Sequence, residues 1–155
     1  MSYLCRPGLD CGALAIEDML RRGPDEDKTL TTASRFLMKR GDYARAASLR
    51  RRRVERHPDA WEPRVDLATS LLFTRDLAGA RDAFNAAARL APGDWSEAHM
   101  RSAEGMAWSY FLEGTLARTG ARQLWEKTLD TAPRDSLIAL AARIELENLA
   151  ASRQR

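Results

Sequence analysis

Two short segments of this chain match each other at a spacing of 34 residues. The segment HPDAW at 57–61 returns as APGDW at 91–95, with proline and tryptophan at the same places. A third proline segment, APRDS, follows at 132–136. Between these segments the apolar residues recur at helical spacing, and no stretch alternates as a strand would. A fixed period of this size predicts a repeat protein built from stacked helical units.

The segment 61–92 shows the helical pattern most clearly. A first apolar stripe contains Leu67, Leu71 and Leu72, and a polar turn follows at 74–76. A second apolar stripe contains Leu77, Ala80, Phe84, Ala87 and Ala88. Each predicted helix is too short to be stable alone in water. The short turn makes the two helices antiparallel, so a neighbouring hairpin has to cover their shared apolar face.

These units resemble tetratricopeptide repeats over roughly residues 27–135. In the first copy the residues that carry the resemblance are Gly41, Asp42, Tyr43, Ala46 and Pro58. In the second copy they are Ala68, Leu71, Ala80, Phe84, Ala87 and Pro92. The third copy is irregular, with extra residues before its first helix and in its turn, and its matching residues are Ala107, Tyr110, Gly114, Ala121, Trp125 and Pro133.

The resemblance implies an all-α fold, a right-handed solenoid of tandem antiparallel helix hairpins. We predict one domain over residues 1–155. It divides into an N-terminal helix at 10–22, repeats at 27–60, 61–94 and 95–135, and a C-terminal capping helix at 136–151. Asp10 is the expected N-cap of the first helix.

The predicted C-terminal helix has apolar residues on two sides. One side holds Leu137, Leu140, Ala141 and Ile144, and the other holds Ile138, Ala142 and Leu149. We expect Ile138 and Leu149 to be exposed, either as scattered surface residues or as a second interface. In the second case the helix would bind a partner or form a homodimer.

Four consecutive arginines, Arg50–Arg53, interrupt the second helix of the first repeat. Successive helical residues turn by about 100°, so the four side chains spread over about 300° and cannot all contact one polyanion. Arg50 falls on the core-facing side, where a lone charge is costly unless it is paired or reaches water. We predict a polar joint between Arg50 and a carboxylate of a neighbouring element, with three candidates: Glu17, Asp18 and Asp66. A solvated charge run and a polyanion-binding site are the alternatives.

The resemblance also implies that the first helices of successive repeats line a concave groove. The corresponding positions are Lys28, Thr31, Arg35, Met38 and Lys39 in the first copy, Glu62, Val65, Thr69, Leu72 and Phe73 in the second, and Arg101, Glu104, Trp108 and Phe111 in the third. One end is basic and the other is apolar and aromatic. Such a surface suits a peptide with an acidic end and apolar anchors. The alternative is that Leu72, Phe73, Trp108 and Phe111 pack inside the repeats or under the C-terminal helix.

No residue pattern indicates catalysis, a cofactor or a metal. The two histidines, His57 and His99, have no ligand at metal-binding spacing, and glycine-rich phosphate-binding motifs are absent from the sequence. We therefore predict a non-catalytic scaffold that binds another protein or a peptide, as an adaptor or as a subunit of a larger assembly. Nucleic-acid or polyanion binding through the arginine-rich helix at 50–56 is the alternative function, and ranks below it.

Two further expectations concern the environment of the chain. No apolar run approaches the ~18 residues that a membrane-spanning helix needs. The two cysteines, Cys5 and Cys11, are too few for a disulfide framework. We expect reduced thiols and a cytoplasmic location.

Overall fold

The computed structural model describes residues 10–91, 93, 96–134 and 136–152. Within these residues the chain forms eight α-helices and no strand. The helices are α1 Cys11–Arg22, α2 Asp27–Lys39, α3 Tyr43–Arg56, α4 Glu62–Phe73, α5 Leu77–Arg89, α6 Glu97–Glu113, α7 Thr115–Thr131 and α8 Leu137–Ala151. Pro92 and Trp95, two of the repeat markers in the sequence, lie outside the described residues.

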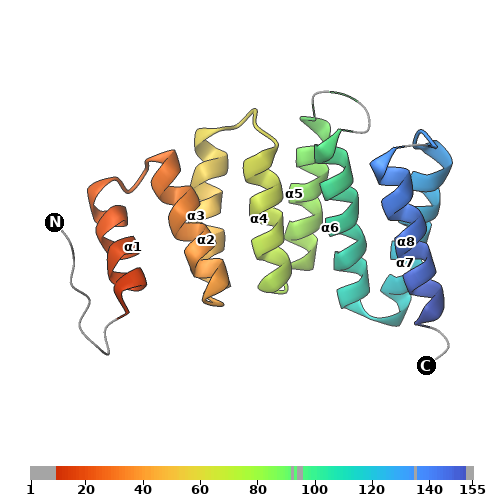
Figure 1. Cartoon of the computed structure of the whole chain (residues 1–155), viewed down its shortest axis with the longest axis horizontal. Coiled ribbons are helices and arrows are strands. Elements are labelled where there is room, and N and C mark those ends of the chain that lie inside the picture. The colour runs from red at the N-terminus through yellow and green to blue at the C-terminus, as the bar shows by residue number, and fades with distance from the viewer. Residues whose placement is uncertain (1–9, 92, 94–95, 135, 153–155) are drawn as a thin grey trace.

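Consecutive helices follow one another along the long axis of the molecule, from α1 at one end to α8 at the other (Figure 1). Each helix packs against the next helix in the chain, and α4 also contacts α6 directly. The hairpins are α2–α3, α4–α5 and α6–α7. The predicted all-α fold of tandem helical hairpins is confirmed. The bounds assigned to the individual repeats stay a prediction.

Aspartates begin the helices α1, α3 and α5. The Oδ1 atoms of Asp10, Asp42 and Asp76 accept hydrogen bonds from backbone N–H groups three residues later, at 3.0, 3.3 and 3.0 Å. These bonds satisfy donors that the first turn of a helix leaves free. The predicted N-cap at Asp10 is confirmed, and the other two caps recur with the 34-residue period of the sequence.

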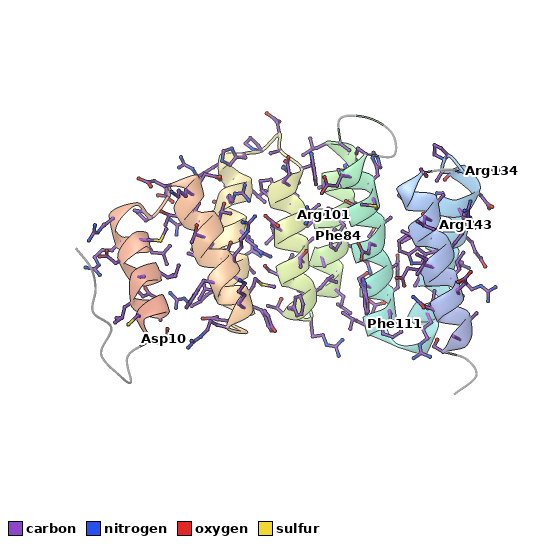
Figure 2. The ribbon with its side chains drawn as sticks, viewed as in Figure 1. Asp10, Phe84, Arg101, Phe111, Arg134 and Arg143 are labelled. Atoms are coloured by element: carbon purple, nitrogen blue, oxygen red, sulfur yellow. The ribbon has the colours of Figure 1, made fainter. Side chains whose placement is uncertain are left out.

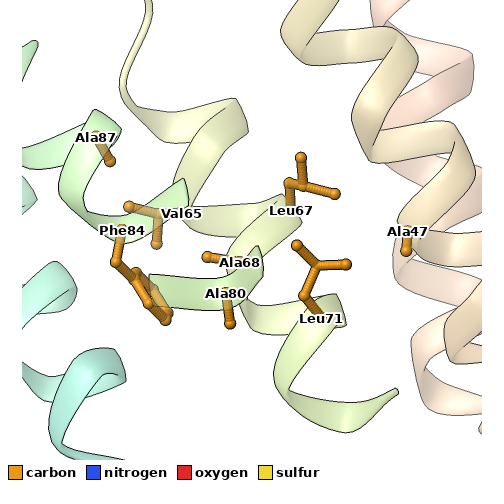
Figure 3. Packing of buried hydrophobic residues seen from close by; sticks show 8 residues of the cluster. All are labelled: Ala47, Val65, Leu67, Ala68, Leu71, Ala80, Phe84 and Ala87. Atoms are coloured by element: carbon orange, nitrogen blue, oxygen red, sulfur yellow. The ribbon is translucent and has the colours of Figure 1, made fainter. Parts of the chain in front are cut away.

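Three apolar clusters form the core, and each joins three successive helices. The central cluster contains Ala47 of α3 and residues of α4 and α5, and Figure 3 shows its buried members: Ala47, Val65, Leu67, Ala68, Leu71, Ala80, Phe84 and Ala87. The N-terminal cluster joins α1, α2 and α3, and the C-terminal cluster joins α6, α7 and α8. No hairpin therefore has a core of its own, and every hairpin is stabilised by its neighbours.

Gly105 of α6 allows a close approach between α5 and α6. The ring of Phe84, which is 2% exposed, lies where a side chain at position 105 would project. A methyl group at this position would overlap three carbon atoms of the ring. The contact between the second and third hairpins therefore depends on glycine, which has no side chain, at position 105.

The orientation predicted for the C-terminal helix is wrong. Ile138 is only 2% exposed within the C-terminal cluster, and Leu149 packs against the same cluster. Ala139 and Ala142 lie on this side of α8 and are fully buried, so small side chains let the helix approach its neighbours closely. The exposed apolar residues of α8 are instead Leu140 and Ile144, at 51% and 48%. Ile138 is therefore buried and not part of a second interface, whereas Leu149 is half-buried and its role in an interface stays a prediction.

The expectation for the cysteines is also wrong at Cys11, which is disulfide-bonded. Cys5 lies outside the described residues. Among the described residues, no helix combines the length and the apolar composition that crossing a membrane requires.

We predict that Gly105→Ala destabilises the protein by about 1–3 kcal/mol, because the added methyl group overpacks the contact with Phe84. Gly120→Ala in α7 is the matched control, since its methyl group would lie 3.1 Å from Tyr110 Cδ1 and helix propensity favours alanine. Urea unfolding of both variants measures the difference. Adding Phe84→Leu to Gly105→Ala should recover part of the loss. Equal unfolding free energies for the two glycine variants would contradict this account of the contact.

Candidate functional site

An apolar groove of about 550 Å³ lies between α4 and α6. We call it the α4–α6 groove. Its floor includes Val65, Phe84 and Gly105, which belong to the contact between the second and third hairpins. The other lining residues are Thr69, Leu72, Phe73, Arg75, Arg101, Glu104, Trp108 and Leu112. The groove is therefore built on the part of the core that holds the two hairpins together.

A second, smaller groove of about 230 Å³ lies between α6 and α8. We call it the α6–α8 groove. Glu104 and Trp108 line both grooves, so the two are adjacent on either side of α6. The remaining lining residues are Ala107, Phe111, Ala121, Trp125, Glu145, Asn148, Leu149 and Ser152.

Three large aromatic side chains in these grooves remain exposed to solvent. Phe73, Trp108 and Phe111 are 55%, 48% and 37% exposed. Phe73 stacks on Tyr43 with 4.8 Å between ring centroids, and Trp108 packs edge-to-face on Phe111 at 5.5 Å. The rings are thus held by one another rather than by burial in the core.

The structure brings together part of the surface that the sequence predicted. Thr69, Leu72, Phe73 and Trp108 line the α4–α6 groove, and Phe111 lines the α6–α8 groove. The predicted residues of α2 line neither groove: Lys28, Arg35 and Lys39 are exposed, and Met38 is half-buried. The Met38 sulfur accepts a hydrogen bond from Ser70 Oγ at 3.5 Å, which joins α2 to α4. The predicted role of all these residues in partner binding stays a prediction.

Arg75 is a groove residue that the sequence did not single out. Its backbone is left-handed, with φ 65°, at the turn after α4, and its side chain donates a hydrogen bond to the carbonyl of Leu112 at 3.2 Å. The equivalent turn residue of the first hairpin is Gly41, with φ 78°, and glycine adopts this conformation at much lower cost. In the sequence, the 34-residue offset between Gly41 and Arg75 was the signal that could have marked Arg75 as the turn residue of the second hairpin.

Arg50 forms the polar joint that the sequence predicted. The side chain is buried, with 7% of the residue exposed, and its Nη1 donates to the carbonyl of Asp66 at 2.6 Å and to Ser70 Oγ at 2.9 Å. The partners are thus a carbonyl and a hydroxyl of α4, where a carboxylate was expected. Burial lowers the pKa of the Arg50 guanidinium, while the charge of Asp66 acts in the opposite direction.

Arg52 and Arg53 pair with carboxylates of neighbouring segments of the chain. Arg53 Nε lies 2.7 Å from Asp27 Oδ1, and its Nη1 lies 3.1 Å from Asp66 Oδ2. Arg52 pairs with Asp25. Arg51 alone among the four is exposed, and it has no ion-pair partner among the described residues. The arginine-rich helix therefore offers a polyanion far fewer cations than the sequence suggested.

Asp27 is held at the start of α2 by two basic side chains. Its Oδ1 accepts a hydrogen bond from Arg53 and lies 3.0 Å from His57 Nε2. The hydrogen bond from Arg53 lowers the pKa of the Asp27 carboxyl below its usual value, and His57 acts in the same direction. The two contacts tie α2 to the end of α3.

Metal-binding chemistry has no visible basis in the part of the chain that the structure describes. Among these residues, no group of three or more histidine, cysteine or acidic side chains is placed to hold a metal ion. The hydroxyl of Thr69 in the α4–α6 groove is bonded within its own helix. Its Oγ1 donates a hydrogen bond to the carbonyl of Val65 at 2.8 Å.

The comparisons with known proteins agree with this architecture. A family model for the tetratricopeptide repeat matches residues 17–103, which is more than half of the chain. The match includes the whole of α2, α3, α4 and α5. The comparison with curated proteins gave no match.

We predict that Arg50→Ala destabilises the protein by about 2–3 kcal/mol, because charged hydrogen bonds to Asp66 and Ser70 are lost in a buried setting. Arg51→Ala is the matched control, and we expect it to change the unfolding free energy by less than about 0.5 kcal/mol. Urea unfolding distinguishes the two. Equal effects of both substitutions would show that Arg50 is not a structural joint.

We predict a pH-dependent contribution of Asp27 to stability. Because the folded-state pKa of Asp27 is lowered from 3.8, its ionised form stabilises the protein above that value, and the stabilisation is lost as the pH falls through the folded-state pKa. The difference in unfolding free energy between wild type and Asp27→Asn should be present above about pH 4 and shrink as the pH falls below it. Denaturant unfolding from neutral to acidic pH measures this difference. Asp82→Asn, at an exposed site in α5, controls for removal of a carboxylate, and a pH-independent Asp27→Asn effect would refute the prediction.

Proposed function

Because the chain belongs to the tetratricopeptide repeat family, we propose that it is a non-catalytic scaffold that binds a segment of another protein in the α4–α6 and α6–α8 grooves. Repeats of this family generally mediate protein–protein interaction, and the family is typically non-catalytic. The protein would act as an adaptor or as a subunit of a larger assembly. The predicted cytoplasmic location stays a prediction.

The observation that carries this proposal is the exposure of Phe73, Trp108 and Phe111 around two adjacent apolar grooves. Large aromatic side chains are enriched among the residues that dominate binding energy at protein interfaces. A partner that buries these rings removes apolar surface from water at about 25 cal/mol per Å². The exposed rings belong to α4 and α6, so one extended or helical segment lying across these two helices would contact all three.

The polar groups of the grooves support binding rather than catalysis. The α4–α6 groove is lined by the charged residues Arg75, Arg101 and Glu104 and by Thr69, whose hydroxyl is bonded to the backbone. Catalysis by a nucleophile needs an adjacent base that activates it, and the lining residues of this groove include neither histidine nor cysteine. Charged groups beside an apolar groove suit the recognition of a peptide.

Nucleic-acid binding through residues 50–56 is less well supported. Arg50, Arg52 and Arg53 are engaged with α4, with the segment before α2 and with Asp27 at the start of α2. A phosphate backbone would have to compete with these internal partners, and the affinity would fall steeply with salt.

We predict that Trp108→Ala removes the partner from the protein. The tagged chain is purified from its native cell, and bound proteins are identified by mass spectrometry. A protein that uses Trp108 as a main anchor should lose about 2 kcal/mol of binding free energy, which corresponds to about thirtyfold in affinity. Leu140→Ala removes an exposed apolar side chain of α8 outside both grooves and is the matched control.

The outcome separates the two functions. Proteins lost with Trp108→Ala and kept with Leu140→Ala support binding in the grooves. Recovery of nucleic acid without protein, or of the same proteins by wild type and Trp108→Ala, would overturn the proposal.

A further inference from the structure

The two grooves differ in the charges that line them. Arg75 and Arg101 line the α4–α6 groove, whereas Glu145 lines the α6–α8 groove. Glu104 stands beside Trp108 and borders both. The charge therefore changes from positive to negative across α6, which lies between the two grooves. Figure 2 labels Arg101 and Phe111 on the upper and lower parts of α6.

These charges are largely available to a partner. Neither Glu104 nor Glu145 forms an ion pair with any described residue. Arg101 has a long contact of 3.7 Å to Glu97, and Arg75 contacts a backbone carbonyl. Charged groups without an internal counter-ion gain most from a complementary charge on a binding partner.

Further exposed cations are present on α2. Lys28, Arg35 and Lys39 are exposed on α2, and none of them has an ion-pair partner in the part of the chain that the structure describes. In Figure 1, α2 lies next to α4 on the side away from α6. The exposed cations of α2 therefore belong to the helix that lies beyond α4, whereas the α6–α8 groove, with Glu104 and Glu145, lies on the other side of α6.

Arg118 lies beside Phe111, a residue that lines the α6–α8 groove. Its guanidinium carbon lies 5.4 Å from the centroid of the Phe111 ring. It is not among the lining residues of the α6–α8 groove, and it interacts with the ring as a cation–π pair. The groove itself therefore keeps the two carboxylates of Glu104 and Glu145 as its charged groups.

We propose that the partner segment carries apolar anchors flanked by acidic residues on one side and basic residues on the other. The acidic flank lies toward α2 and α4, and the basic flank lies over the α6–α8 groove. This inference rests on the proposed function of the grooves and adds the chemistry and the direction of the segment that they bind. A segment in the reverse direction would place like charges together at both ends, which disfavours it.

The same charges exclude partners of uniform sign. A wholly acidic segment or a phosphate backbone would meet Glu104 and Glu145, and a wholly basic segment would meet Arg75, Arg101 and the cations of α2. Like charges at an interface oppose association. A segment with separated charges is the one that matches both ends.

A display library of random peptides, selected against the full chain, tests this inference. Clones that also bind Trp108→Ala are discarded, so that only groove-dependent peptides remain. We expect these peptides to carry large apolar residues with acidic residues on one flank and basic residues on the other. A selected peptide, made synthetically and measured by fluorescence anisotropy, should bind Glu145→Lys about five- to tenfold more weakly than wild type.

Glu147→Lys is the matched control, because Glu147 is exposed on α8 and lines neither groove. It should change the affinity by less than about twofold. Glu145→Gln removes the charge with little change of shape and should weaken binding by about two- to threefold, which keeps the test informative if Glu145→Lys fails to fold. Circular dichroism verifies the fold of each variant.

The two ways of failing are distinct. Groove-dependent peptides without a basic flank, or an affinity unchanged by both Glu145 variants, would overturn this inference and leave binding in the grooves standing. A selection that yields no peptide dependent on Trp108 would overturn the proposed function, and this inference with it.

Discussion

The ring of Phe84 lies against Gly105 where α5 meets α6, and this contact joins the second hairpin to the third. The helices of the chain have 12 to 17 residues and would be marginal in isolation. Each helix gains stability by packing its apolar face against neighbouring helices. Accordingly, each of the three core clusters contains residues of three successive helices. The α4–α6 groove shares its floor with the same contact, so the shape of the groove depends on how the two hairpins are joined.

An arginine adds a polar contact at each of the two joins between hairpins: Arg50, which is buried, and Arg81, which is half-buried. Arg50 of α3 reaches Asp66 and Ser70 of α4. Arg81 of α5 acts in the same way on α6: its Nε donates to Ser109 Oγ at 2.7 Å, and its guanidinium carbon lies 4.0 Å from the centroid of the Tyr110 ring. Apolar contacts tolerate small shifts of one helix along another, whereas directional hydrogen bonds do not. The two arginines therefore fix the position of each hairpin relative to the next.

The 34-residue period and the paired apolar stripes were enough to predict the hairpins, because both can be read along the chain. The joint at Arg50 was predictable for the same reason, since a charge on an apolar helix face needs a partner. The orientation of α8 was not predictable from periodicity, because its two apolar sides are similar. Small residues at Ala139 and Ala142 decide it through close packing, which only the neighbouring helices define. Glu145 was missed as a consequence.

The exposed aromatic rings explain why this surface suits binding better than an apolar patch of flexible side chains. Phe73 is held by Tyr43 of the preceding hairpin, and Trp108 and Phe111 hold each other on one face of α6. A partner bound as proposed would meet rings that are already in place, so little side-chain entropy would be lost when they are covered. The array can leave these rings exposed because the core clusters beneath them, which include Val65, Phe84 and Trp125, already stabilise the fold.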